Sequence, residues 1–463
     1  MVPSPPPHAP TAPWRRELRA CAALSLPLVV TNAIEMAMNL TNAAFVGRIA
    51  PEALAAVTLA LALYSVALTF GIGLTAAVSP LISAEVGRTG GRGPAARRVV
   101  QGGLWNAALI VGPIWLILWR AEPILRAAGQ EPALARAAGA YLHVMQWGLL
   151  PVLVYLVLRS MLAALERPRW AVMTGVLGIA VNAGLNAALI GGGLGLPALG
   201  VAGSALATLL SNLFMAAVLA GAVLLDPRLR DLRLLGGIAR PPVAACAALW
   251  RVGLPIGIGV MLETGAFAAA TGLVGAHDPA ALPAHAIALQ VASFTFMVPL
   301  GIAQAVSVRV GRAAGAGDAA GVGRAGWAGL ALGLGTMAAT ALAMLALPGP
   351  IIGLFLDPAT PGAGAVARTA TALLALAGAF QIADGAQVVL AGMLRGLQDT
   401  RAPMVIAGVG YWCFGVPIAA LLAPRYAAPG VWVGLLAGLF AVAAMLLWRW
   451  RFRRPPGGPA PSR

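Results

Sequence analysis

The two halves of the sequence repeat each other, and this repeat constrains the fold more than any other feature. Leu26-Pro27 returns as Leu254-Pro255, a displacement of 228 positions. The same displacement relates Glu35 to Glu263. A chain of 463 residues with two similar halves is a duplicated unit. In a membrane protein, such duplication is typical of transporters in which one half moves against the other.

The composition indicates a membrane protein. The chain is 60% hydrophobic and 10% charged, and its mean hydropathy is +0.86. A soluble protein of this size could not cover its surface with so few charges. Apolar stretches of about 20 residues, each long enough to cross a bilayer core, recur along the whole length. We count twelve, six in each half, and predict an all-α integral membrane protein made of two six-helix bundles.

The repeat also predicts the domain organisation. We expect a disordered cytoplasmic tail at 1–13, the first bundle at 14–225, a cytoplasmic linker at 226–242, the second bundle at 243–454 and another tail at 455–463. An even number of spans in each copy makes the repeats parallel. A transport pathway is therefore expected where the two copies meet.

The positive charge follows the predicted topology. The net charge is +16, and all 31 basic residues are arginines. They concentrate in both tails, in the central linker and in the loops after even-numbered spans. By the positive-inside rule, both termini and the linker lie in the cytoplasm. The charge thus indicates contact with lipid headgroups, and it argues against nucleic acid as a partner.

Three carboxylates lie well inside the hydrophobic stretches: Glu35, Glu263 and Asp384. A charge at the centre of a membrane helix costs about 2.5–3.5 kcal/mol, so such residues usually face a cavity and serve a function. For Glu263 and Asp384 we favour a role in binding over the alternative, a carboxylate that is protonated or hydrogen-bonded between helices.

Neighbouring side chains support a cation site in the second half. Phe380, Asp384 and Gln387 share one face of the tenth span, and Glu263 and Phe267 share a face of the seventh. A carboxylate, an amide and an aromatic ring together suit a cation. For Phe267 and Phe380 taken singly, ordinary packing is the better explanation.

The first span carries a related but altered pattern. Glu35 and Asn42 are seven residues apart and share a face. Glu35 could carry a proton, whereas Asn42 could not. The residues favour neither a functional nor a structural role for Glu35. Asn42 is included in the candidate site, although an amide there more commonly forms a helix–helix hydrogen bond.

Several other kinds of chemistry find no support. The absence of lysine rules out a phosphate-binding loop that ends in Gly-Lys-Ser/Thr. The three cysteines are isolated and suggest neither a disulfide nor a metal site. His277, His285 and the pair Tyr411-Trp412 are interpreted as interfacial residues. We find no nucleophile–base constellation, so we expect neither an enzyme nor a cofactor.

Ordered segments of the second half resemble a known family. They are Ala284–Gln290, Phe296–Gly301, Val308–Gly311, Gln381–Val388, Ala391–Thr400, Tyr411-Trp412 and Gly430–Gly434. Together they resemble the multidrug and toxic compound extrusion (MATE) family, in its NorM-like branch. The resemblance covers nearly all twelve spans.

This resemblance implies a V-shaped pair of six-helix bundles in the bacterial inner membrane. It also implies a monomer that exports organic cations or drugs in exchange for Na⁺ or H⁺. Carboxylates matching Glu263 and Asp384 take part in cation coupling in the family, so Na⁺ could bind there. The chain departs from the family at Asn42, where an aspartate is usual, and at Glu35, where an amide is commoner. Either coupling relies on the second-half pair, or Glu35 replaces the missing acid.

Rival functions share parts of this pattern. A lipid-linked oligosaccharide flippase of the same superfamily is the main alternative, but it should hold basic groups for a diphosphate. Arg159 is one candidate for that role, and we interpret it instead as a residue that extends its charge to the membrane interface. A major-facilitator transporter would carry an acidic-arginine signature that the loop at 85–98 lacks. A passive channel is a further alternative.

Overall fold

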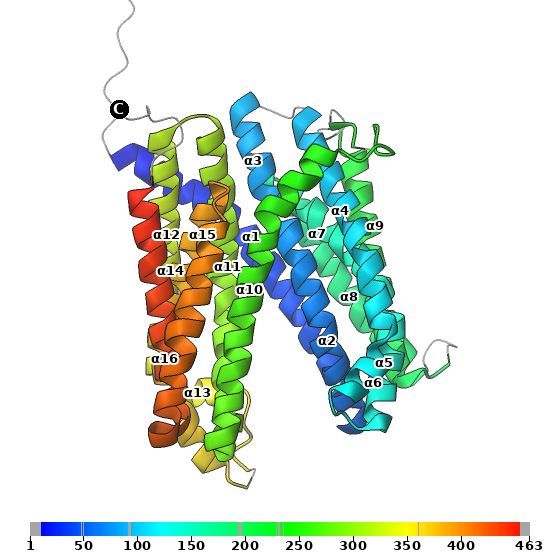
Figure 1. Cartoon of the computed structure of the whole chain (residues 1–463), viewed down its shortest axis with the longest axis vertical. Coiled ribbons are helices and arrows are strands. Elements are labelled where there is room, and N and C mark those ends of the chain that lie inside the picture. The colour runs from blue at the N-terminus through cyan, green and yellow to red at the C-terminus, as the bar shows by residue number, and fades with distance from the viewer. Residues whose placement is uncertain are drawn as a thin grey trace, which may run out of the picture. The chain divides into compact units, whose positions relative to one another are not determined.

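The computed structural model consists of helices (Figure 1). It describes residues 11–47, 49, 51–90, 94–192, 197–227, 229, 232–234, 236–359 and 361–453. Eleven helical segments in this part of the chain are long and apolar enough to cross a membrane. The last, 401–452, is interrupted at Ala427, where φ is 51° and ψ is −139°, and so provides two crossings. The predicted all-α fold with twelve spans is confirmed.

The helices of the first copy match the six expected spans. They are α1 (Thr11–Gly47), α2 (Pro51–Ala76) with α3 (Val78–Thr89), α4 (Pro94–Trp119) with the short α5 (Ala121–Ala127), α6 (Pro132–Met145) with α7 (Leu149–Ala164), α8 (Arg169–Gly191) and α9 (Gly200–Leu225).

The second copy follows the same order. Its helices are α10 (Val243–His277), α11 (Leu282–Gly315), α12 (Ala319–Ala346) with the short α13 (Pro348–Gly353), α14 (Ala363–Gly396), α15 (Arg401–Gly408) and α16 (Val416–Phe452). A π-helical segment, η4 (Val409–Gly415), joins the last two.

One predicted boundary is wrong. The segment 11–13, assigned to the disordered tail, forms the start of α1. Pro13 fits there because the first turn of a helix does not use its missing N–H. The remaining tail residues, 1–10 and 454–463, lie outside the described residues. The helices α9 and α10 end and begin at the predicted limits of the linker. The division into two bundles stays a prediction.

The linker is packed against the first copy. Trp105 on α4 donates its indole N–H to the carbonyl of Ile238 at 2.8 Å. Gln101, also on α4, donates its amide to the carbonyls of Leu234 and Gly236 at 2.8 and 3.0 Å. Side-chain donors on α4 thus satisfy three backbone carbonyls of the linker.

The helices form two compact units that do not follow the two sequence copies. Unit 1 contains Met1–Val29, Gly265–Asp399 and Ile406–Arg463, and unit 2 contains Val30–Thr264 and Thr400–Val405. The start of α1 therefore packs with helices of the second copy. Likewise, the start of α10 packs with helices of the first.

Each copy thus packs the start of its first helix against the other copy, and two close helix contacts show that this arrangement is symmetric. In unit 2, a Cβ added to Gly73 on α2 would lie 2.3 Å from the Cα of Gly257 on α10. In unit 1, a Cβ added to Gly301 on α11 would lie 2.7 Å from the backbone nitrogen of Val29 on α1. The 228-residue displacement relates Gly73 to Gly301 and Val29 to Gly257. Small residues allow this approach because they let backbones come together without an intervening side chain.

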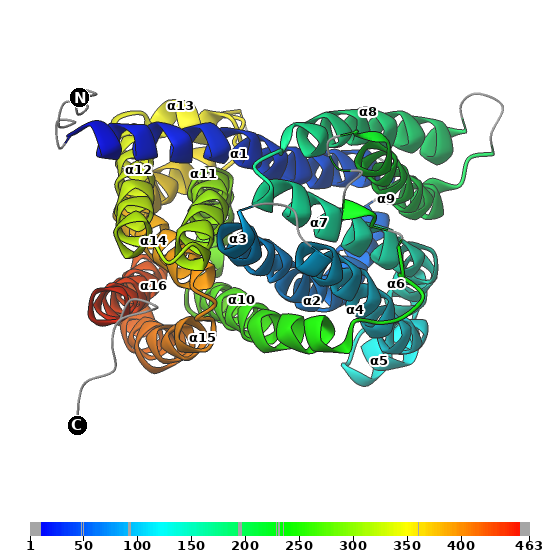
Figure 2. The same ribbon diagram turned by 90° about the horizontal axis from the view of Figure 1, so that it is seen from above.

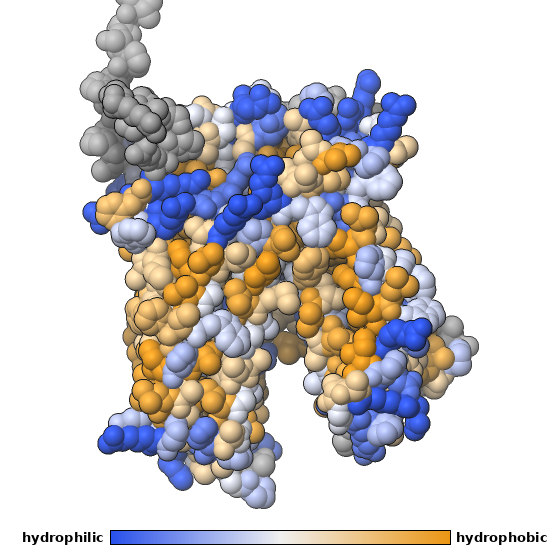
Figure 3. Space-filling view, viewed as in Figure 1, coloured by the Kyte–Doolittle hydropathy of each residue, from blue (hydrophilic) through white to orange (hydrophobic). Residues whose placement is uncertain are grey.

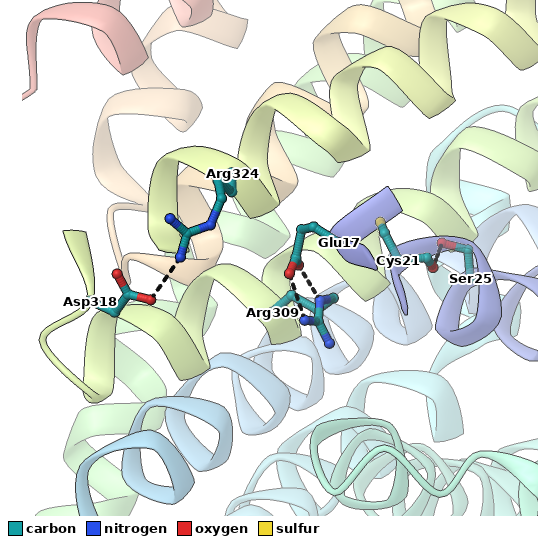
Figure 4. Close-up of polar contacts among 6 residues, drawn as sticks. All are labelled: Glu17, Cys21, Ser25, Arg309, Asp318 and Arg324. Atoms are coloured by element: carbon teal, nitrogen blue, oxygen red, sulfur yellow. Dashed lines mark hydrogen bonds and ion pairs between the residues drawn. The ribbon is translucent and has the colours of Figure 1, made fainter. Parts of the chain in front are cut away.

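An ion pair fixes the start of α1 within unit 1. Arg309 on α11 donates from Nε and Nη2 to the two carboxylate oxygens of Glu17, with Nη2 2.9 Å from Oε2 (Figure 4). One turn further along α1, Cys21 is fully buried, and Ser25 donates to its carbonyl at 2.7 Å. A two-pronged guanidinium–carboxylate contact fixes orientation as well as distance.

A second ion-pair group joins the turn after α14 to the end of α16 and the residue that follows it. Asp399 lies 3.0 Å from Nη2 of Arg449 and 3.2 Å from Nη1 of Arg453. Burial lowers the pKa of the Arg453 guanidinium, but its ordinary value is so far above neutrality that the group stays charged. These two arginines thus form ion pairs with Asp399. They also lie on the side where the sequence predicts contact with lipid headgroups.

Helix α14 lies at the centre of unit 1. It packs against α11, α12 and α16, which stand beside it in Figure 2. In its most apolar stretch, 72% of the residues are buried inside the protein. On the face in Figure 3, apolar side chains cover the middle of the helices and hydrophilic ones gather toward both ends. A carboxylate on α14 is therefore held away from water by protein on several sides.

The glycine contact in unit 1 predicts a stability effect. We expect Gly301→Ala to lower the free energy of unfolding by about 1–3 kcal/mol, because the added methyl group would overlap the backbone of α1. The change is measured as a lower midpoint of thermal unfolding of the purified protein in detergent. Gly335→Ala on α12, where a Cβ would meet nothing within 4 Å, is the matched control. Equal midpoints for the two variants would contradict the contact.

Candidate functional site

The predicted second-half residues lie on two helices. Asp384, Phe380 and Gln387 are on α14, and all three are buried. Phe267 is on α10 in the same unit, and Glu263 precedes it by one helical turn. Both segments are helical, so the predicted residues on each helix share one face, as their spacing indicates.

The carboxylate of Asp384 lies in an apolar interior. The residue is 4% exposed, and the helix around it is the most buried of the candidate spans. One turn away, Gln387 donates from Nε2 to the hydroxyl of Tyr411 at 3.2 Å. A buried carboxylate of this kind is costly unless a cation, a proton or hydrogen bonds compensate it. A carboxylate at this position can therefore take up a cation or a proton.

Aromatic rings extend from this face of α14. The ring of Phe380 meets that of Phe267 edge to face with centroids 5.9 Å apart, and that of Trp432 with centroids 5.6 Å apart. Phe380 and Trp432 are buried, whereas Phe267 is half-buried. Phe380 thus serves as packing behind Phe267, and the exposed part of Phe267 is the surface that could contact a bound cation.

Two residues interpreted as interfacial are buried, so those predictions are wrong. His285 and Tyr411 are each 1% exposed. Their polar atoms have partners inside the protein, Trp432 for His285 and Gln387 for Tyr411. A paired polar tip lets an aromatic ring enter the core. Trp412 is 43% exposed, as a residue at the protein surface would be.

In the first half, Glu35 on α1 forms an ion pair with Arg159 on α7. The side chain of Arg159 is 14% exposed, so the prediction that it extends to the interface is wrong. A guanidinium enclosed in an apolar region needs a counter-charge. Glu35 supplies it, and this pairing favours a structural role for Glu35 over proton carrying.

Asn42 contacts a neighbouring helix. Its Oδ1 accepts a hydrogen bond of 2.9 Å from Nδ2 of Asn186 on α8. The same Nδ2 is 2.9 Å from the carbonyl of Asn182. The amide thus behaves as the helix–helix hydrogen bonder that its residue type favours.

No group of three or more His, Cys, Asp or Glu side chains in the described part of the chain could hold a metal together. A Na⁺ ion at Glu263 or Asp384 would therefore need oxygens from amides, hydroxyls or carbonyls. Such oxygen donors suit hard cations. Near Asp384, Gln387 and Tyr411 supply groups of this type.

The sequence analysis names Arg159 and His285 but assigns them other roles than the structure shows. In the structure each contacts a partner on another helix. One signal was available for Arg159, because charges inside a membrane pair with one another and Glu35 lies in the same copy. No sequence signal connects His285 to Trp432, which is 147 positions away.

The Glu35–Arg159 pair predicts a compensated double variant. We expect Glu35→Gln to lower the free energy of unfolding by about 1–3 kcal/mol, because Arg159 would lose its counter-charge. This is less than for a fully buried pair, since the Glu35 side chain is 38% exposed. Adding Arg159→Met should recover most of the loss. Thermal unfolding of the purified variants measures both.

The control for this experiment is a surface pair of the same type. Glu122 and Arg126, one turn apart on α5, have side chains 35% and 44% exposed. Glu122→Gln should change stability by less than about 0.5 kcal/mol. A double variant no more stable than Glu35→Gln alone would show that the pair does not matter.

Comparison with known proteins agrees with this architecture. The family model described as MatE matches residues 27–188 and 255–421, two segments whose starts are again 228 positions apart. The chain is 47% identical to "Probable multidrug resistance protein NorM" of Mesorhizobium japonicum, over 96% of this chain and 95% of that protein. It is 42% identical to the protein of the same name from Brucella suis, with 95% and 93% covered.

Solved structures share the fold. The crystal structure of the eukaryotic MATE transporter AtDTX14 matches with a TM-score of 0.86, covering 96% of this chain and 97% of that one. The two sequences are 19% identical. With the family model matched in both copies and relatives similar over nearly their whole length, the chain belongs to the MatE family.

Proposed function

We propose that this chain is a secondary multidrug exporter that moves lipophilic organic cations across the membrane in exchange for Na⁺ or H⁺. The observation that carries the proposal is Asp384, a carboxylate 4% exposed at the centre of a membrane-spanning unit. Family membership supports it, and relatives are named as multidrug resistance proteins. Intramembrane carboxylates of this kind mark ion and substrate pathways.

The exchange follows from competition for negative charge. When Asp384 and Glu263 carry neither a proton nor Na⁺, they attract a cationic drug. When the site opens to the other side, the coupling ion binds the same carboxylates and removes that attraction. A limited negative charge cannot hold both cations at once in a low-dielectric site. Drug and ion therefore bind alternately, which is the condition for antiport.

We place the coupling in the second half of the chain. In the first half, Asn42 cannot ionise and bonds to Asn186. Glu35 is neutralised by Arg159. Glu263 and Asp384 match the carboxylates on which the family relies. The alternative, that Glu35 replaces the missing acid, would require its ion pair to open during transport.

The arginine distribution supports a topology with both termini in the cytoplasm, in the inner membrane of a bacterium. Anionic headgroups would contact the arginines on that side. We also propose that the protein works as a monomer, because each chain carries both copies needed for alternating access.

A lipid-linked oligosaccharide flippase is the second candidate, and the first-half geometry argues against it. Such a protein needs basic groups for a diphosphate. Arg159, the candidate for that role, already binds Glu35. A diphosphate would have to displace this carboxylate.

The proposal predicts which carboxylates matter for transport. In proteoliposomes with an imposed Na⁺ or proton gradient, we expect Asp384→Asn and Glu263→Gln to slow ethidium transport by about 10-fold or more. This is the scale of losing one contact to a charged group, about 1.5–3 kcal/mol. Glu52→Gln, at an exposed position in the first turn of α2, should transport at the wild-type rate.

Comparison of the two gradients identifies the coupling ion. A Na⁺ gradient that drives transport at equal pH on both sides indicates Na⁺, and a pH gradient without Na⁺ indicates protons. Wild-type transport that ignores both gradients would refute antiport. Undiminished transport by the double variant of Asp384 and Glu263 would refute the site.

A further inference from the structure

Five residues on four helices of unit 1 form a closed circuit around His285. Trp432 on α16 donates its indole N–H to Nδ1 of His285 on α11 at 3.0 Å. Nε2 of His285 is 3.0 Å from the hydroxyl of Thr271 on α10. Thr271 in turn donates to the carbonyl of Phe267 at 3.0 Å. Ring contacts from Trp432 to Phe380 on α14, and from Phe380 to Phe267, complete the circuit.

The protons in this circuit have one consistent arrangement. The indole of Trp432 can donate and cannot accept, so Nδ1 of His285 must be unprotonated. The carbonyl of Phe267 can accept and cannot donate, so the hydroxyl of Thr271 points toward it. Nε2 of His285 therefore carries the hydrogen and donates to that hydroxyl. The imidazole is neutral, and its tautomer is set by its neighbours.

Phe267 takes part in two contacts of the circuit. Its main-chain carbonyl accepts the hydrogen bond from Thr271, one turn later on α10. Its ring rests edge to face on Phe380, which rests on Trp432. His285 is the member that joins the hydrogen-bonded side to the aromatic side. Removing its two hydrogen bonds would leave the indole N–H of Trp432 without this acceptor and would separate Trp432 from Thr271.

Burial distinguishes the supporting members from the presented one. His285, Phe380 and Trp432 are 1%, 2% and 0% exposed, respectively. Phe267 is half-buried, so part of this residue is exposed. The circuit thus fixes the orientation of one partly exposed aromatic face. Buried, fully satisfied polar groups of this kind make a single arrangement rigid.

The position of this face relates it to the proposed cation site. Phe267 follows Glu263 by one turn on α10, and Phe380 precedes Asp384 by one turn on α14. Within unit 1, the circuit therefore fixes the two aromatic rings that lie next to the Asp384 face of α14. A cation drawn by Asp384 would meet the ring of Phe267.

We propose that His285 is a positioning residue for substrate binding, which holds the ring of Phe267 in the orientation that receives an aromatic cation. The proposal rests on the function proposed above and adds a residue outside the carboxylate site. His285 acts in its neutral form, because a proton added at Nδ1 would face the indole N–H of Trp432, donor against donor.

The test is equilibrium binding of ethidium to the purified full-length protein, followed by fluorescence. His285→Leu keeps an apolar side chain but removes both hydrogen bonds, and we expect its Kd to rise by about 10-fold, the scale of one cation–π contact. His285→Asn should bind within about 3-fold of wild type, because its amide can accept from Trp432 and donate to Thr271. Trp432→Phe, which keeps a ring but loses the N–H, should resemble His285→Leu.

The matched control is the other histidine of this region. His277 at the end of α10 is exposed, and its Nδ1 contacts the carbonyl of Leu273 at 3.0 Å. His277→Leu should bind ethidium as the wild type does. Thermal unfolding verifies that each variant is folded. If His285→Leu does not fold, His285→Asn and Trp432→Phe decide the question.

The outcomes separate this inference from the proposed function. Wild-type binding by His285→Leu or by Trp432→Phe would overturn the positioning role, and so would equal losses in His285→Leu and His285→Asn. Gradient-driven ethidium transport by the wild type tests the export function separately. A wild type that binds ethidium without transporting it would refute export and leave the binding comparison valid.

Discussion

The interior of a bilayer offers no water to a charged group, and this constraint accounts for most of the polar structure of the protein. Each intramembrane charge must have a partner or a function. Glu35 and Arg159 neutralise each other within unit 2. Asp384 lies on α14, the most buried span of unit 1, and we propose a function for it in binding cations. The two halves thus differ in the use of their acids, with a paired Glu35 in the first half and a proposed cation-binding Asp384 in the second.

Helix contacts obey the same constraint. Lipid is as apolar as leucine, so membrane helices associate through close packing rather than by hiding apolar surface from water. The contact of Gly73 with Gly257 and that of Gly301 with Val29 are equivalent under the internal repeat. Through them, the first helix of each copy packs beside the second helix of the other copy. Duplication is therefore preserved in the packing as well as in the sequence.

The candidate site could be predicted in part. Helical periodicity places Phe380, Asp384 and Gln387 on one face, and the structure finds all three buried on α14. Periodicity does not reveal which helix that face meets. The hydrogen bond from Gln387 to Tyr411 and the bond from Trp432 to His285 both depend on that packing. Tyr411 and His285 were consequently interpreted as interfacial, because each looks amphipathic when considered alone.

By itself, the sequence determined the number of spans, the duplication and the identity of the carboxylates within the spans. These follow from local hydropathy and from self-similarity, which require no knowledge of neighbours. The tertiary structure decided the partners: Arg159 for Glu35, Asn186 for Asn42 and Trp432 for His285. These residues are 124, 144 and 147 positions apart. Such pairings depend on how each helix is rotated against the others, and packing sets that rotation after the spans have formed.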